Sequence, residues 1–347
     1  MPTHVTAFGP GRVNLIGEHT DYNQGLALPF AIGEGVTVKA AATVGRRIET
    51  NAVDLGRSDR FELDRPRRVK GWRAFVHGAV AELVRAGVPV PAARLEISGT
   101  VPRGSGLSSS AALEVALTLA LIALSGATGP DRTELAKLCS RIENEWVGAQ
   151  TGLLDQLACL YGEVGHALRI DFRSLEVSPV ALELDGHQLV MLDSGEHHSN
   201  AASGYNQRRA ECARACELLG IPSLREATLE MARQLPEPLN RRVRHVVSDN
   251  ARVDQAVEAL RRRDFKQLGR LLDAAHASLR DDYEISTPAV DAAVQRLKHG
   301  GALGARIIGG GFGGHVLGLL PPDARAPGGA LGVRPAAGAR VLPDQVR

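Results

Sequence analysis

The feature that most constrains this chain is a glycine- and serine-rich turn that opens directly into an apolar helix. Residues 102–110 contain a Gly-Ser-Gly step followed by leucine and three consecutive serines, and the apolar run of residues 111–124 follows at once. Glycines let backbone N–H groups approach a ligand closely, and a helix N-terminus adds partial positive charge. The turn therefore predicts a phosphate-binding site. An ordinary serine N-cap would explain one serine and one glycine, and the absence of Gly-Lys-Ser or Gly-Lys-Thr excludes a P-loop.

Length and composition set the class of protein. The chain has 347 residues, of which 44% are hydrophobic and 23% are charged, which predicts a globular protein of about two domains. The 41 Lys and Arg nearly balance 39 Asp and Glu, giving a net charge of +2. No overall field therefore draws the chain to nucleic acid or to a membrane. We expect a monomer that binds neither.

Cysteine content and the apolar runs indicate the compartment. Four cysteines in 347 residues are too few for a secreted disulfide framework, so inert thiols in a reducing compartment are expected. The first residues show no signal peptide, and the most apolar run, residues 115–124, is far shorter than the roughly 20 residues of a membrane span. We expect a cytoplasmic protein.

Hydrophobic periodicity predicts mixed strands and helices. We expect strands at residues 36–42, 94–97, 167–171, 188–193, 305–308 and 316–320, and helices at residues 74–86, 111–124, 131–147 and 153–160, with a helical pattern over 205–277. A polar stretch at residues 175–185 suggests the domain boundary. The predicted domains are residues 1–180 and 181–347.

A second dense segment lies near the N-terminus. Residues 11–22 hold one Arg, one Asn, one His and two carboxylates beside glycines. Such a concentration of hydrogen-bonding groups suits a polyhydroxylated ligand, for which a sugar is the natural interpretation. The alternative is an N-terminal strand followed by a surface turn with ordinary caps.

Two further segments are less specific. The run of residues 309–314 satisfies G-x-G-x-x-G, but no βαβ unit can follow it and no carboxylate stands about 20 residues on, so a dinucleotide site is not favoured. A glycine loop that closes against a substrate fits better. Asp155 begins an apolar helix, where spacing alone favours N-capping over general-base chemistry.

Six segments in order resemble the GHMP family of small-molecule kinases. Residues 11–25 resemble the signature of its galactokinase branch, residues 102–112 its phosphate loop, and residues 309–314 its third, glycine-rich motif. Residues 152–156, 204–209 and 278–284 also resemble galactokinase segments. The resemblance implies an α+β, two-domain GHMP kinase fold, with an N-terminal ribosomal-protein-S5-like domain, a C-terminal ferredoxin-like domain and the active site in the cleft between them.

The resemblance also implies an activity and its residues. The reaction would transfer the γ-phosphoryl of ATP to the anomeric hydroxyl of galactose, with Mg²⁺ bound. Asp155 and Arg12 match the catalytic pair, and Trp72 either flanks the adenine or packs in the core. Substrate contacts are implied for Glu18, His19, Thr20, Asp21 and Tyr205, ATP contacts for Gly104, Ser105, Gly106, Leu107, Ser108, Ser109 and Ser110, and magnesium contacts for Ser110 and Glu143.

Alternatives remain within this resemblance. The chain could phosphorylate a related sugar, such as N-acetylgalactosamine or arabinose, or act as a galactose- and ATP-binding sensor without catalysis. The sequence also departs from the family after Leu320, where a helix is expected and residues 321–329 are rich in Pro and Gly instead. We expect a shortened C-terminal tail.

Overall fold

A six-stranded sheet forms the N-terminal half of the molecule. The computed structural model describes residues 2–101, 106–196 and 201–343, with side chains from residue 204 in the last range. The strand order is β13-β1-β3-β6-β4-β5, and only β4 and β6 pair in parallel. Its strands are β1 (His4–Asn14), β3 (Pro29–Ala42), β4 (Arg47–Ala52), β5 (Arg57–Glu62), β6 (Ala93–Gly99) and β13 (Arg340–Leu342).

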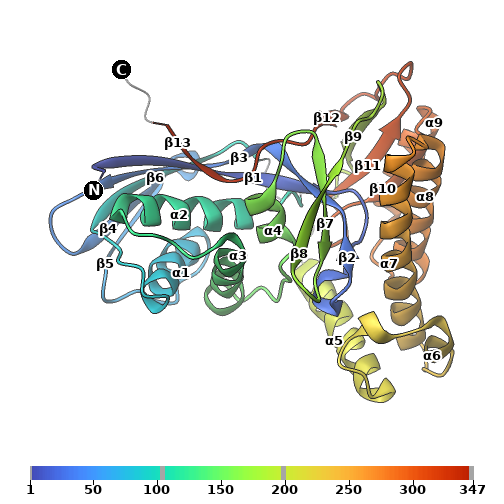
Figure 1. Cartoon of the computed structure of the whole chain (residues 1–347), viewed down its shortest axis with the longest axis horizontal. Coiled ribbons are helices and arrows are strands. Elements are labelled where there is room, and N and C mark those ends of the chain that lie inside the picture. Colours follow the sequence, from blue (N-terminus) through green and yellow to red (C-terminus); the bar gives the residue numbers. More distant parts are fainter. Residues whose placement is uncertain (1, 102–105, 197–200, 344–347) are drawn as a thin grey trace.

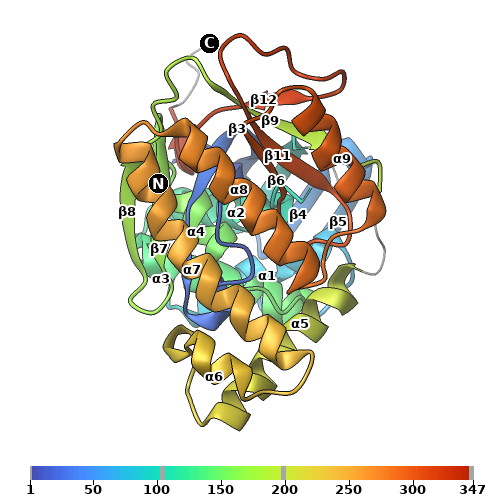
Figure 2. The ribbon, with the colours of Figure 1, turned by 90° about the vertical axis from the view of Figure 1, so that its right-hand side faces the viewer.

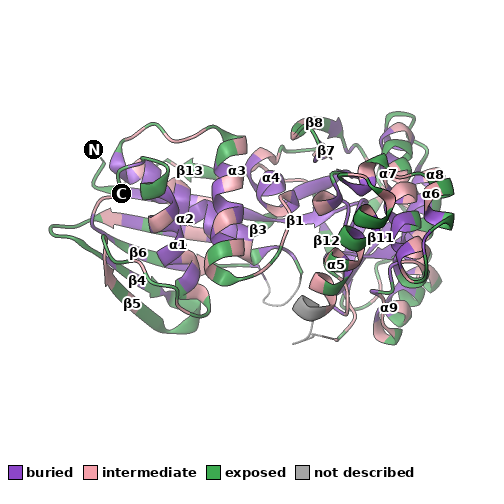
Figure 3. Ribbon diagram, turned by 90° about the horizontal axis from the view of Figure 1, so that it is seen from below, coloured by how far each residue is buried: buried purple, intermediate pink, exposed green. Residues whose placement is uncertain are grey.

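Four helices lie along one face of this sheet (Figure 1). They are α1 (Trp72–Arg85), α2 (Ser109–Ser125), α3 (Arg132–Arg141) and α4 (Leu154–Tyr161). The helix α2 is apolar on nearly all sides because it packs against β1, β3 and the neighbouring helices. In Figure 3 it lies in the buried layer, whereas the β4–β5 edge is largely exposed. The expected helix over residues 131–147 is present from Arg132 to Val147, but its last part, Ile142–Val147, is π-helical and not α-helical.

A second layer of sheet and helix forms the C-terminal half. The four-stranded sheet has the order β10-β11-β9-β12, and the long helices α7 and α8 cover this end of the molecule (Figure 2). Its elements are β9 (Gln188–Asp193), α5 (Ala201–Leu219), α6 (Leu229–Arg233), α7 (Leu239–Arg261), α8 (Phe265–Asp281), α9 (Pro288–His299), β10 (Gly304–Ile307), β11 (His315–Leu320) and β12 (Leu331–Val333). The helical pattern expected over residues 205–277 is therefore four separate helices.

A small sheet and three short helices complete the fold. The strands β2 (Leu26–Ala27), β7 (His166–Asp171) and β8 (Glu176–Ala181) form a three-stranded sheet. Single 3₁₀ turns lie at Asp21–Asn23, Val53–Leu55 and Leu224–Glu226. The four cysteines form no disulfide. Among the described residues, no helix is both long and apolar enough to cross a bilayer.

The C-terminal tail joins both halves. Residues 321–330 form no helix, as the sequence indicates, and the chain then supplies two short strands. The strand β12 pairs with β9 in the C-terminal sheet, whereas β13 pairs with β1 in the N-terminal sheet. The predicted boundary between residues 180 and 181 stays a prediction, and the last strand crosses back over it.

Candidate active site

The predicted site residues converge on one polar pocket between the two halves. The pocket has a volume of about 180 Å³, below the 300–1,000 Å³ typical of sites for drug-sized ligands, so it suits a small polar molecule. It is lined by Arg12, Glu18, His19, Asp21, Thr151, Gly152, Leu154, Asp155, Tyr205, Gly309 and Gly310. The lining of the pocket therefore brings together segments that are nearly 300 residues apart in sequence, such as those of Arg12 and Gly310.

Arg12 and Asp155 form the ion pair at the mouth of this pocket. A bulge shifts the register of β1 between Pro10 and Arg12, and bulges of this kind redirect a side chain from its strand. Arg12 Nε lies 2.6 Å from Asp155 Oδ1, and Nη1 donates to the Gly106 carbonyl at 2.6 Å. Burial alone would lower the pKa of Arg12, but the Asp155, Glu18 and Asp21 carboxylates together outweigh burial and the pKa is raised.

Asp155 does not cap its helix. The N-cap of α4 is Leu153, and no side chain caps it. The Asp155 carboxylate instead accepts hydrogen bonds from Arg12 and from the Ser108 hydroxyl. The N-capping interpretation that spacing alone favoured is wrong. The carboxylate instead makes tertiary contacts with β1 and with the glycine- and serine-rich turn of residues 102–110, called the serine loop below.

Glu18 is held by a buried arginine that the sequence analysis missed. Arg306, on β10, is fully buried, and its Nη2 lies 3.2 Å from Glu18 Oε1. The same Glu18 oxygen accepts a hydrogen bond from the Gly309 N–H at 2.8 Å. One signal was present: Arg306 is the single charge in the apolar strand of residues 305–308, directly before the glycine run.

His19 and Asp21 line the pocket, and burial shifts the pKa of the two side chains in opposite directions. Burial lowers the pKa of His19 to about 3, so the imidazole is neutral at physiological pH. Burial raises the pKa of Asp21 to about 6, and the Asp155 and Glu18 charges add to that rise. Gly152 leaves room for the Asp21 carboxylate, since a Cβ there would overlap it.

Tyr205 and Thr20 differ in their placement. The Tyr205 ring lies 4.9 Å from the His19 ring and contacts the Gly310 side of the pocket. Thr20 is fully buried behind the pocket, and its hydroxyl faces the carbonyls of Gly17 and Leu26 at 3.0 and 2.7 Å. The structure therefore does not bring the Thr20 side chain to the substrate side.

The serine loop lies beside Asp155. Gly104 and Ser105 lie outside the described residues. Leu107 accepts a hydrogen bond from the Arg12 N–H at 3.2 Å, and Ser108 has a left-handed backbone with φ of 59°. Helix α2 starts at Ser109, and Ser109 and Ser110 line a second pocket of about 390 Å³ with Trp72 and Phe75. Free N–H groups at a helix start favour an anion at that junction.

Two buried carboxylates lie beyond the serine loop. Glu143 lies in the π-helical turn and accepts hydrogen bonds from Ser110, from Thr151 at 2.8 Å and from Gln156 at 3.0 Å. Burial raises its pKa, and the Asp155 charge raises it further. Glu114, on α2, shares the Gln156 amide, and burial raises its pKa well above the usual range.

One of these carboxylates, that of Glu143, has the chemistry of a metal ligand. Among the described residues, no group of three or more His, Cys, Asp or Glu is arranged to hold an ion. Ser110 and Glu143 nevertheless offer a hydroxyl and a carboxylate side by side. Mg²⁺ takes oxygen ligands, often one or two from protein and the rest from phosphates and water. This donor set, with a carboxylate destabilised by burial, fits a cation that arrives with a nucleotide.

Comparison with known proteins agrees with this geometry. Residues 2–42 match the model described as the galactokinase galactose-binding signature, and residues 74–163 and 256–333 match the GHMP kinase N-terminal and C-terminal domains. A galactokinase of Mycobacterium tuberculosis is 45% identical over 326 residues, covering 92% of this chain and 90% of the relative. The chain belongs to the galactokinase family of GHMP kinases.

Other members of the GHMP kinases extend the match. A galactokinase of Thermotoga maritima is 38% identical over 309 residues, covering 89% of this chain and 87% of the relative. The crystal structure of Lactococcus lactis galactokinase complexed with galactose superposes with a TM-score of 0.92 at 32% identity, over 98% of this chain and 95% of that one. Mevalonate kinase of Methanococcus jannaschii, at 20% identity over 96% of this chain and 99% of that one, shares the fold with a TM-score of 0.70. The expected two-domain GHMP kinase fold is confirmed.

Proposed function

We propose that this chain transfers the γ-phosphoryl group of ATP to the anomeric hydroxyl of galactose, giving galactose 1-phosphate. The observation that carries the proposal is the position of the Arg12–Asp155 pair, 2.6 Å apart, between the polar pocket and the serine loop. A hydroxyl in the pocket and a phosphate on the loop would meet at this pair. The similarity to the galactose-bound Lactococcus lactis enzyme supports galactose as the occupant.

The acceptor side follows from the polar groups of the pocket. Glu18 and Asp21 offer carboxylate oxygens to sugar hydroxyls, and Gly309 and Gly310 bring backbone close to the ligand. A pocket built from fixed donors and acceptors rejects an epimer strongly, because a misplaced hydroxyl leaves buried polar groups unpaired. These contacts would distinguish galactose from glucose.

The phosphoryl transfer uses the Arg12–Asp155 pair. The Asp155 carboxylate orients and polarises the anomeric hydroxyl and accepts its proton as the oxygen bonds to the γ-phosphorus and the bond to the bridging oxygen of ADP breaks. A loose transition state has limited need of a strong base, so orientation is the larger part of this role. The Arg12 guanidinium stabilises charge on the transferring phosphoryl group.

The nucleotide side follows from the second pocket. Trp72, Phe75 and Leu113 supply an apolar wall for the base, and Ser109 and Ser110 lie at its phosphate end. Ser110 and Glu143 would hold Mg²⁺, which when bound neutralises phosphate charge. Gly104 and Ser105 stay predicted ATP contacts, and a cytoplasmic monomer stays the expectation of the sequence.

The proposal is tested by ADP release from the purified chain with Mg-ATP. Galactose, glucose, N-acetylgalactosamine, arabinose and mevalonate are offered in parallel wells. Turnover with galactose alone is expected. Turnover only with a different sugar would overturn the choice of substrate, and a rise in melting temperature with galactose but no ADP would indicate a sensor without catalysis.

A further inference from the structure

Behind the sugar pocket, four side chains form an unbroken chain of hydrogen bonds. His19 Nδ1 lies 2.8 Å from the Tyr22 hydroxyl, which lies 2.9 Å from the Tyr283 hydroxyl, which lies 3.1 Å from Cys212 Sγ. His19, Cys212 and Tyr283 are all buried. This hydrogen-bond chain thus connects a wall of the pocket with α5 and with the segment after α8.

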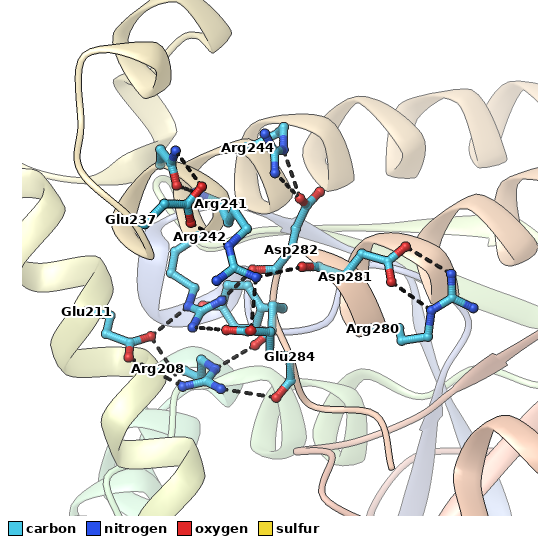
Figure 4. A network of polar contacts seen from close by, with 12 residues as sticks. Arg208, Glu211, Glu237, Arg241, Arg242, Arg244, Arg280, Asp281, Asp282 and Glu284 are labelled. Carbon is cyan, nitrogen blue, oxygen red and sulfur yellow. Dashed lines mark hydrogen bonds and ion pairs between the residues drawn. The ribbon is translucent and has the colours of Figure 1, made fainter. Parts of the chain in front are cut away.

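Tyr283 is held in place by a network of arginines and carboxylates (Figure 4). Arg208 donates to the Tyr283 carbonyl at 2.5 Å, and the buried Arg242 donates to the Asp282 carbonyl at 2.5 Å. Arg242 also binds Glu211 and Glu284, at 2.6 Å each. Because the backbone is fixed on both sides of Tyr283, its hydroxyl has little freedom to move away from Tyr22.

The chain can carry its hydrogens in only two directions. Each of the four groups has one hydrogen to donate, because His19 is neutral and burial raises the pKa of the Cys212 thiol to about 11. The hydrogen-bond chain makes three hydrogen bonds, and among the described residues neither tyrosine hydroxyl has a partner outside it. When both hydroxyl hydrogens stay within the hydrogen-bond chain, one hydrogen remains at an end, either on His19 Nε2 or on Cys212 Sγ.

The surroundings of the two ends favour a hydrogen on Nε2. In the described part of the chain, His19 Nε2 is buried without a hydrogen-bond partner. The Gly310 backbone acts to raise the pKa of His19, and the Glu18 and Asp21 carboxylates line the same pocket. At the other end, the Asn23 amide already directs a donor at Cys212 Sγ, at 3.7 Å. A leftover hydrogen is better placed among acceptors than beside a donor.

We propose that Cys212, Tyr283 and Tyr22 hold His19 in the tautomer protonated on Nε2, so that the part of the pocket wall formed by His19 carries a fixed N–H donor. Tyr22 and Tyr283 are then positioning residues that act through His19. The inference rests on the proposed function for the identity of the ligand, an oxygen acceptor of the sugar. A donor that cannot change to an acceptor penalises a sugar that lacks this oxygen.

The test reads the tautomer directly. Nitrogen-15 NMR of the full chain labelled at its 11 histidines distinguishes an Nε2–H from an Nδ1–H ring, and His19→Gln assigns the signal. We expect Nε2–H in the unaltered chain and a mixture or an Nδ1–H ring in Tyr22→Phe, which removes the hydroxyl that bonds Nδ1 and the Tyr283 hydroxyl. Cys212→Ala should move the signal the same way by a smaller amount.

Kinetics give the second readout. Tyr22→Phe should raise KM for galactose about three- to tenfold and change kcat less than about twofold, as expected for weakening one hydrogen bond. The matched control is Tyr161→Phe, since Tyr161 also donates or accepts one hydrogen bond, to Thr133 at 2.7 Å, outside the pocket. This control should leave both the His19 signal and KM unchanged.

Two results would overturn the inference: an Nδ1–H ring in the unaltered chain, or an unchanged His19 signal in both Tyr22→Phe and Cys212→Ala. The NMR experiment needs neither ATP nor sugar. A chain with the expected tautomer but no turnover with galactose would therefore contradict the proposed function and leave the hydrogen-bond chain standing.

Discussion

The two sides of the active site treat their buried carboxylates differently. On the sugar side, Glu18 is paired with Arg306 and Asp155 with Arg12, and of the carboxylates on this side only Asp21 has no ion pair within the described residues. On the phosphate side, Glu114 and Glu143 share the Gln156 amide, and within the described residues neither forms an ion pair with Lys or Arg. We therefore expect the sugar side to be organised before a ligand arrives and the phosphate side to be completed by a ligand and its cation.

The strongest test of this comparison is to remove one of the paired arginines from the sugar side. Arg306→Met leaves Glu18 buried without its partner, which should lower the free energy of unfolding by about 3–5 kcal/mol. Chemical denaturation measures this. Arg262→Met is the control, because the Arg262–Glu258 pair is largely exposed and its loss should cost no more than about 1 kcal/mol.

A double substitution separates the pair from the packing. Glu18→Gln in the Arg306→Met background removes the unpaired charge and should restore part of the lost stability. Equal stability losses in Arg306→Met and in Arg262→Met would show that Glu18 does not depend on its partner.

The second prediction concerns the reaction itself. Asp155→Ala should lower kcat at least about 10²-fold, because the hydroxyl loses its orienting carboxylate, while galactose binding stays measurable by calorimetry. Unchanged turnover would remove Asp155 from the mechanism. Loss of galactose binding together with turnover would assign it to the sugar pocket instead.

The third prediction sharpens the comparison on the phosphate side. Glu143→Gln should raise the Mg²⁺ concentration for half-maximal activity at least about tenfold, since one of two protein oxygen donors loses its charge. ADP release is measured over a magnesium titration at saturating galactose. A curve that coincides with that of the unaltered chain would count against Glu143 as a metal contact.

The fourth prediction uses the raised pKa of Asp21. Its carboxylate is ionised only above a pH of about 6, so kcat/KM for galactose should fall as the pH drops below about 6, when the carboxyl group loses acceptor capacity. His19, with a pKa of about 3, stays neutral over this range. Asp21→Asn should lack this acidic limb; its persistence would mean that another group titrates.

The smallest effect is expected at Glu114. Burial raises the pKa of Glu114 well above the usual range and so favours the neutral carboxyl group, for which Glu114→Gln is nearly isosteric. Stability should change by less than about 1 kcal/mol, and the magnesium titration should not shift. It is the matched control for Glu143→Gln, since both carboxylates contact Gln156. A large loss of stability would show that Glu114 is charged.

Much of the fold could be predicted from the sequence because its signals are local. The serine turn and the apolar run at residues 111–124 predict α2 to within two residues, since a largely apolar helix and its polar start are both visible in the order of residues. The π-helical turn at Ile142–Val147 was missed, because nothing in local periodicity separates it from the end of α3.

The candidate site was less accessible to sequence reasoning. From its spacing alone, Asp155 was interpreted as a helix cap. Only the resemblance to a family suggested a catalytic role for it. Arg306 was overlooked inside an apolar strand, and Thr20 was grouped with the sugar contacts because it lies between His19 and Asp21. Adjacent residues can point in opposite directions, so a motif identifies a segment and not the side chains that face the ligand.

The sequence by itself determined which segments hold glycines, serines, carboxylates and arginine, and hence that a phosphate and a polyhydroxylated ligand meet on this chain. Only the tertiary structure decided which charges are paired, that Arg306 supports Glu18, and that Tyr22, Tyr283 and Cys212 line up behind His19. The physical reason is distance. Helix caps and apolar faces depend on neighbours a few residues away, whereas ion pairs and hydrogen bonds join residues that are far apart in sequence, 288 positions in the case of Glu18 and Arg306.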